Sequence, residues 1–278
     1  MTPYDKKRTF FSDMDSLPGK KLFIVLGKGR DYTFDNPQSH AKIVNGVHKI
    51  VKETILQHQP QKTIGFGSSR CAYATLLIGS MAGFDRILAM APADLILGAP
   101  HSLSSKFIAN PDPHYSNLIP FIEESSARID LLLPCFGWRD GFNIRLSRSI
   151  KNENCRVHYV HGEHGIGKKM IRERLTLKIM SQVLGQEDFC LPAGWKAEES
   201  EISLAEATFD LASSLDRDVL DIPEIDDEMS ENFHWFYLKS VALKKKGEDQ
   251  EASCALTRAL ELEPNTAYWR KFERLSNH

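Results

Sequence analysis

Residues 62–91, KTIGFGSSRCAYATLLIGSMAGFDRILAMA, contain two short apolar runs separated by a longer one. The runs at 62–66 and 86–91 have the length of buried strands, and the stretch from about Arg70 to Met81 has the length of a helix. Glycines and serines at 65–69 favour a sharp turn between the first strand and that helix. The pattern predicts two parallel strands joined by a crossover helix.

The same alternation extends on both sides of this unit. Further strand-like runs are KLFIVL (21–26), RIDLLLP (128–134) and CRVHYV (155–160). We expect helices near 39–57, 141–151 and 168–184, the last of them capped by Gly185. Because these runs are apolar throughout, they suit a parallel sheet covered on both faces. For residues 20–185 we therefore predict a doubly wound α/β domain of about five strands.

Composition excludes several classes of protein. The formal net charge of −2 gives no general attraction to nucleic acid or to anionic membranes. No apolar run has the length of a membrane span, and the N-terminal residues lack the apolar core of a signal peptide, so we expect a cytoplasmic protein. Five scattered cysteines without CxxC spacing predict reduced thiols rather than disulfides or a zinc site.

In open parallel sheets, ligands bind beyond the carboxyl ends of the strands. The residues that follow the five predicted strands are therefore the candidates for a site. They are Gly27–Arg30, Gly67–Arg70, Pro92–Asp94, Phe136–Asp140 and His161–His164. A serine, an aspartate and a histidine occur there in that chain order.

Residues 65–93, GFGSSRCAYATLLIGSMAGFDRILAMAPA, resemble the nucleophile elbow of the α/β-hydrolase superfamily, in which G-x-S-x-G places a serine between strand and helix. The resemblance puts Ser69 at the nucleophile position and replaces the last motif glycine by Cys71. Ser68 is the rival, but Phe66 stands where its motif glycine would be. A capping serine in an ordinary strand-to-helix turn is the structural alternative.

The resemblance also implies a base. In HGEHGIGKKMIRERL (161–175), His164 occupies the place of the family's last histidine, where a strand ends and a helix begins. His158, inside the predicted strand, and His161, at its exit, are lesser candidates. A metal site made of these three histidines is not expected, because their spacing gives the imidazoles no common face.

Asp140 is the candidate acid, in the loop after the 128–134 strand, from which a family acid would reach the histidine. Glu163 is the second candidate for the acid. Asp130 stands at the start of a strand, at the wrong end of the sheet. The structural alternative makes Asp140 the N-cap of a helix over 141–151.

The oxyanion hole that the family implies would use the backbone N–H of Arg70 and that of Gly27 or Lys28. Arg30 and Lys28 either attract an anionic substrate or are simply solvated. Residues 92–127 are long for a connection and predict a lid-like insertion. In it, Phe107 and Tyr115 either line an acyl or sugar pocket or pack the insertion down.

Beyond Gly185 the chain changes character. Residues 196–231 carry 13 acidic side chains and two basic ones, so we predict for 186–231 an acidic connector with a short helix at about 202–215. Residues 232–278 resemble one tetratricopeptide repeat and a closing helix. The matching positions are Phe236, Ser240, Leu243, Gly247, Ala252, Leu256, Ala259 and Pro264. Such a unit serves either as a buttress or as a docking site for a protein partner or a second copy.

Together these features predict a serine-dependent acyl or ester hydrolase that acts on small acylated molecules through Ser69, His164 and Asp140. No cofactor and no metal are expected. Two other functions stay open. One is an acyltransferase with the same triad, and the other is an inactive hydrolase-fold protein that acts in binding or assembly.

Overall fold

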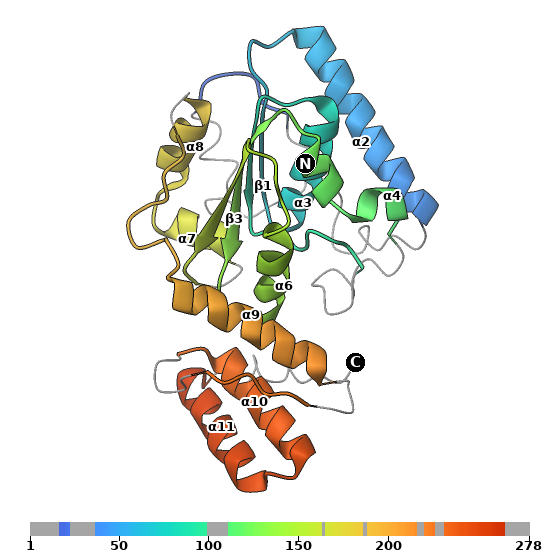
Figure 1. Cartoon of the computed structure of the whole chain (residues 1–278). Helices are drawn as coiled ribbons and strands as arrows, with labels where there is room; N and C mark the ends of the chain where they lie inside the picture. The colour runs from blue at the N-terminus through green and yellow to red at the C-terminus, as the bar shows by residue number, and fades with distance from the viewer. Residues whose placement is uncertain are drawn as a thin grey trace.

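The computed structural model describes residues 17–22, 37–98, 111–162, 165–185, 188–215, 220–225 and 231–264, and it is an α/β structure with a parallel sheet (Figure 1). Within these residues, four strands form the sheet: β1 (Ile64–Ser68), β2 (Arg86–Met90), β3 (Arg128–Pro134) and β4 (Cys155–Val160). The helices are α2 (Pro37–His58), α3 (Arg70–Ala82), α4 (Pro113–Ser116), α5 (Ile119–Glu123), α6 (Trp138–Ser147), α7 (Ile166–Arg172), α8 (Thr176–Leu184), α9 (Glu199–Ser214), α10 (Phe233–Lys246) and α11 (Asp249–Leu262).

The strands lie in the order β1-β2-β3-β4, and every pair is parallel. In register, Gly67 is opposite Ala89, Ala89 is opposite Leu131, and Leu131 is opposite Val157. All four carboxyl ends therefore meet at one edge of the sheet, with Ser69, Ala91, Cys135 and His161 as the first residues beyond it.

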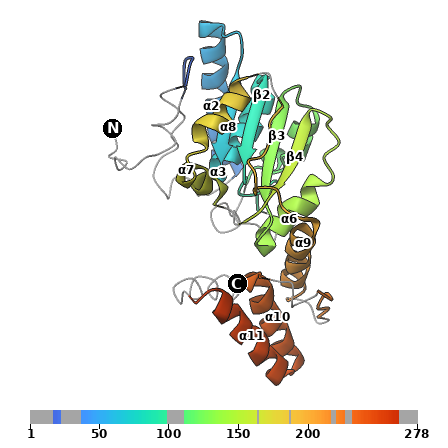
Figure 2. The ribbon, with the colours of Figure 1, turned by 90° about the vertical axis from the view of Figure 1, so that its left-hand side faces the viewer.

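Helices cover both faces of the sheet, as the apolar strands require. On one face, α2, α3, α5 and α6 pack on a cluster that includes Leu76, Ile87 and Leu131. On the other face, α7 and α8 pack on Leu88, Met90 and Leu132 through side chains such as Ile166 and Ile179. Figure 1 shows α7 and α8 on one side of the sheet and α2 and α3 on the other, and Figure 2 looks from the side of α7 and α8 onto strands β2, β3 and β4.

Helix α9 connects the sheet domain with the C-terminal helices. Its first half, with Ile202 and Ala205, belongs to the core beside the sheet, and its last turn packs on α10. Gly141 of α6 permits the close approach, because a Cβ there would lie 2.1 Å from the Ala205 carbonyl oxygen. In Figure 1, α6, α9 and the α10–α11 pair follow one another away from the sheet.

The acidic residues of α9 explain part of the acidic run in the sequence. Asp210 accepts two hydrogen bonds of 2.6 Å from Arg145, and Glu206 accepts one of 2.7 Å from Arg148. Arg145 lies in the last turn of α6, and Arg148 is its C-cap residue. This part of the predicted connector is therefore a helix fixed to the sheet domain.

The C-terminal unit is an antiparallel pair of helices. Asn232 caps α10 by accepting the N–H groups of His234 and Trp235 at 3.0 and 3.3 Å. Gly247 ends α10 with φ 82°, a left-handed conformation that favours glycine. Most of the small and apolar positions matched to the repeat are buried, but Leu256 is 39 % exposed.

The strands expected at 128–134 and 155–160 are confirmed residue for residue. The single helix expected over 168–184 is wrong. Arg174 has φ 57°, and the N–H of Leu175 donates to the Met170 carbonyl at 2.9 Å, which closes α7 before α8 begins. Gly185 follows α8 as expected, but with φ −65° it is not a left-handed cap.

Residues 23–26 of the first expected strand lie outside the described residues. Within the described ranges, no helix combines the length and the apolar character needed to cross a bilayer.

Candidate functional site

Ser69 occupies the turn between β1 and α3 in an unusual backbone conformation. Its φ of 55° and ψ of −123° match the first central residue of a type II′ turn, a position that glycine dominates. Two hydrogen bonds to the exit of β2 fix this turn: the Ser69 N–H donates to Met90 O at 2.9 Å, and Ala93 N–H donates to Ser69 O at 3.3 Å. A non-glycine residue held in such strain is characteristic of functional sites.

Gly67 makes room for this turn. A Cβ at Gly67 would lie 2.4 Å from the backbone oxygen of Cys71 and 2.6 Å from the Thr75 hydroxyl. The Cys71 side chain is itself exposed, so a cysteine in place of the motif glycine obstructs nothing here. The close approach of helix and strand therefore depends on Gly67 and not on a small residue at 71.

Arg70 is the first residue of α3, a helix of 13 residues. Its N–H therefore lies at the positive end of the helix dipole, where a developing negative charge is stabilised. Gly27, Lys28 and Arg30, the other residues assigned to the oxyanion hole or to the substrate, lie outside the described residues.

The exit of β2 carries a buried carboxylate, that of Asp94. Asp94 is 0 % exposed, and the loop that holds it is fixed by Asn143 of α6, whose Oδ1 accepts the Leu95 N–H at 2.9 Å. Sequence reasoning placed Asp94 among the strand exits but did not consider it as an acid. Its position four residues beyond a strand was the available signal.

Asp140 lies at the exit of β3, in the first turn of α6, and is 5 % exposed. Its Oδ2 accepts the Gly137 N–H at 3.0 Å. The expected alternative, Asp140 as the N-cap of a helix over 141–151, is wrong in detail, because α6 starts earlier, with Gly137 as its N-cap and Asp140 three residues on. This bond is part of a capping box at the start of α6, so Asp140 does cap the helix, and the bond also orients the carboxylate.

His161, the first residue after β4, faces α9. Its Nδ1 lies 2.5 Å from Glu201 Oε1, and the other oxygen of Glu201 accepts the Glu198 N–H at 2.9 Å. Since β1 and β4 are three strand spacings apart, or about 14 Å, an imidazole turned toward α9 is poorly placed to serve Ser69. Glu201 was not anticipated as a partner from the sequence. His164 and Glu163 lie outside the described residues.

Tyr115 lies in the insertion, in α4, and packs against helices instead of facing solvent. It is 8 % exposed, its hydroxyl donates to Asn45 Oδ1 at 2.8 Å, and its ring stacks on Phe121 at 6.3 Å. These contacts fit the second of its two expected roles, that of packing the insertion down. Phe107 lies outside the described residues.

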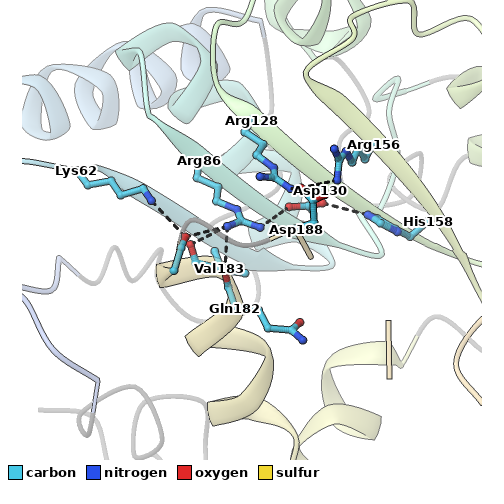
Figure 3. Close-up of polar contacts among 10 residues, drawn as sticks. Lys62, Arg86, Arg128, Asp130, Arg156, His158, Gln182, Val183 and Asp188 are labelled. Atoms are coloured by element: carbon cyan, nitrogen blue, oxygen red, sulfur yellow. Dashed lines mark hydrogen bonds and ion pairs between the residues drawn. The ribbon is translucent and has the colours of Figure 1, made fainter. Parts of the chain in front are cut away.

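The opposite half of the sheet holds a network of buried charges (Figure 3). Asp130 accepts hydrogen bonds of 3.1 Å from Arg86 and from His158. Arg86 also binds the last carbonyls of α8, at 3.0 Å to Gln182 O and 3.2 Å to Val183 O. Burial disfavours the charge of Asp130, but the hydrogen bonds from His158 and Arg86 outweigh it and hold the pKa of the carboxyl below its ordinary value.

This network accounts for His158, one of the lesser candidates for the base. His158 lies two residues before the end of β4, and its imidazole is engaged with Asp130. Among the described residues, no group of three or more histidine, cysteine, aspartate or glutamate side chains could hold a metal ion.

Comparison with known proteins adds no relative: no family model, no curated protein and no solved structure matches the chain.

Proposed function

We propose that the protein is a serine hydrolase of the α/β-hydrolase type that cleaves esters of small acylated molecules, with Ser69 as nucleophile, His164 as base and Asp140 as acid. One observation carries the proposal: Ser69 has φ 55° and ψ −123° in the turn between β1 and α3. That turn lifts the side chain of the nucleophile above the sheet in the resembled family.

The order of the strands supports the assignment of the three roles. Ser69 and Asp140 follow β1 and β3 at the same edge, and His164 comes four residues after the end of β4. Beyond His164, Ile166 of α7 packs in one cluster with Leu88 and Met90 of β2. The chain thus runs from β4 back toward the middle of the sheet, and the three residues from His161 to His164 can span about 10 Å.

The chemistry follows from these positions. Ser69 Oγ attacks the ester carbonyl carbon while His164 takes the hydroxyl proton, and backbone amides stabilise the oxyanion. The C–O bond to the alcohol then breaks, and the alcohol leaves with the proton from the imidazolium. Water attacks the acyl-serine in the same way and releases the carboxylic acid and free Ser69. Asp140 keeps the imidazole in the tautomer that accepts the proton.

The proposal is tested by the intact mass of the protein after incubation with a fluorophosphonate. We expect one adduct on the unmodified protein, none on Ser69→Ala, and slow labelling of His164→Ala and Asp140→Asn. Ser68→Ala is the matched control and should be labelled like the unmodified protein. An unmodified protein that is folded but gives no adduct would contradict the proposal.

A second function, binding or assembly without catalysis, is favoured by a hollow on the C-terminal unit. Two adjoining depressions of about 550 and 470 Å³ share Lys239 and Leu243 in their walls. Phe236 and Ala255 line one of them, and Ile222 and Ile225 line the other. Absence of labelling, together with a change in sedimentation when Leu243→Asp is introduced, would favour this function over hydrolysis.

A further inference from the structure

The C-terminal unit touches the sheet domain next to the candidate acid. The side chain of Phe136, in the loop after β3, lies 5.5 Å from the ring of Phe233 and 5.7 Å from that of His234. Phe136 and Trp138 belong to the same apolar cluster as Trp235 of α10. The loop that leads into Asp140 is therefore packed against the start of α10.

One peptide group links the two parts. The carbonyl of Phe136 accepts a short hydrogen bond from the Asn232 side-chain amide. The N–H of the same peptide, which belongs to Gly137, donates to Asp140 Oδ2 at 3.0 Å. Both Asn232 and Asp140 are almost fully buried, at 4 % and 5 % exposed. Hydrogen bonds in such a chain polarise and strengthen one another.

Both ends of the Asn232 side-chain amide are engaged, so Asn232 can pass a displacement of α10 on to the peptide that it binds. Its Oδ1 caps α10 by accepting the His234 N–H at 3.0 Å, so its amide nitrogen is left pointing at Phe136. Gly137 has no side chain to separate the partners: a Cβ there would lie 3.3 Å from Asp140 Oδ2 and 3.9 Å from His234 Nε2.

We propose that Asn232 is a positioning residue of the serine site, which through the peptide between Phe136 and Gly137 sets the place of the Asp140 carboxylate. The inference rests on the proposed function, in which Asp140 orients His164. It makes the C-terminal unit part of the site's framework, so that a ligand that moves the start of α10 changes the reactivity of Ser69.

The test separates the two tasks of Asn232. Asn232→Ser keeps an oxygen that caps α10 and removes the amide that binds Phe136 O. We expect fluorophosphonate labelling of Ser69 to slow on the order of tenfold, since small displacements of catalytic groups have effects of this size or larger. The pH profile of labelling should change as well, because a displaced Asp140 carboxylate no longer holds the proposed base in the same way.

Burial lowers the pKa of His234 to about 3, with the charge of Arg139 contributing, so this imidazole stays neutral throughout such a profile.

A second measurement follows the link without activity. Hydrogen exchange of the Gly137 amide should be faster in Asn232→Ser, because its hydrogen bond to Asp140 is weakened. The control is Ala252→Gly in α11, a position buried in a cluster with Leu243 and Ala255 that does not contain Phe136. This substitution costs about 1 kcal/mol by helix propensity. It should change neither the labelling rate nor the Gly137 exchange.

The possible failures are distinct. Labelling of Asn232→Ser at the unmodified rate, unchanged Gly137 exchange, or equal slowing by Ala252→Gly would overturn the positioning role while the hydrolase function stands. An unmodified protein that is not labelled at all would overturn the proposed function, and the positioning role with it.

Discussion

The two halves of the sheet treat polar residues in opposite ways. In the half toward the amino ends, Arg86 and Asp130 bind each other inside the fold, and His158 of β4 binds the same carboxylate. At the carboxyl ends, Ser69 is held in a strained backbone conformation, in which its peptide groups bind Met90 and Ala93.

The difference separates polar side chains that hold the fold together from a strained residue at a candidate site. Charges that bind one another across β2, β3 and β4 hold α8 on the sheet, which is a structural task. A non-glycine residue in a strained conformation at a strand exit costs stability, and residues kept in such conformations cluster at functional sites. Stability and reactivity should therefore respond in opposite ways to substitutions in the two halves.

The largest expected effect is loss of stability at the buried network. Asp130→Ala leaves the guanidinium of Arg86 buried without its carboxylate, and we expect a cost of about 3–5 kcal/mol in the free energy of unfolding. Urea denaturation measures it. The control is Asp188→Ala, which removes the exposed carboxylate that binds Arg128 and Arg156 and should leave the midpoint nearly unchanged. Equal losses in the two variants would refute the structural role of the buried network.

Next in size is the contact that keeps α6 beside α9. Gly141→Ala places a methyl group against the Ala205 backbone, and we expect destabilisation of about 1–3 kcal/mol, measured by the urea midpoint. Gly46→Ala is the matched control in α2, where a Cβ meets nothing within 4 Å. It should stabilise the protein by about 0.5–1 kcal/mol. A stabilising Gly141→Ala would show that the two helices are not in close contact.

A smaller effect with the opposite sign is expected at the strained serine. Ser69→Gly relieves the strain and should raise the free energy of unfolding by about 1 kcal/mol relative to Ser69→Ala, which keeps the Cβ. Both variants should lose labelling. Arg174→Gly, at an exposed residue with φ 57°, should gain similar stability and keep labelling. If Ser69→Gly is no more stable than Ser69→Ala, the strain at the turn is not real.

The smallest expected effect concerns pH. Since the pKa of Asp130 is lower in the folded protein than its ordinary 3.8, the unfolded chain binds the proton more readily. The stability that Asp130 contributes is thus present above about pH 4 and is lost as the pH falls through the lowered folded value. Asp130→Asn should show a shallower loss of unfolding free energy between pH 5 and pH 2, measured by urea denaturation at each pH. An unchanged slope would contradict this.

Most elements could be predicted because their signals are local. The apolar runs at 128–134 and 155–160 became strands with the expected bounds, and the turn at Ser69 follows from its glycines. The break between α7 and α8 could not be predicted, since no glycine or proline marks it and an arginine takes the left-handed conformation. The partner of His161 could not be predicted either, because Glu201 is 40 residues away in a segment predicted to be a connector.

The sequence by itself determined the α/β class, the parallel strands and the strand exits at which polar residues gather, because periodicity and turn residues act over a few neighbouring positions. Only the tertiary structure decided which of these polar residues meet. It turned His161 toward Glu201, enclosed Asp130 between Arg86 and His158, and joined Asn232 to the peptide that holds Asp140. Such pairings depend on how helices pack across the sheet, and packing is set by side chains far apart along the chain.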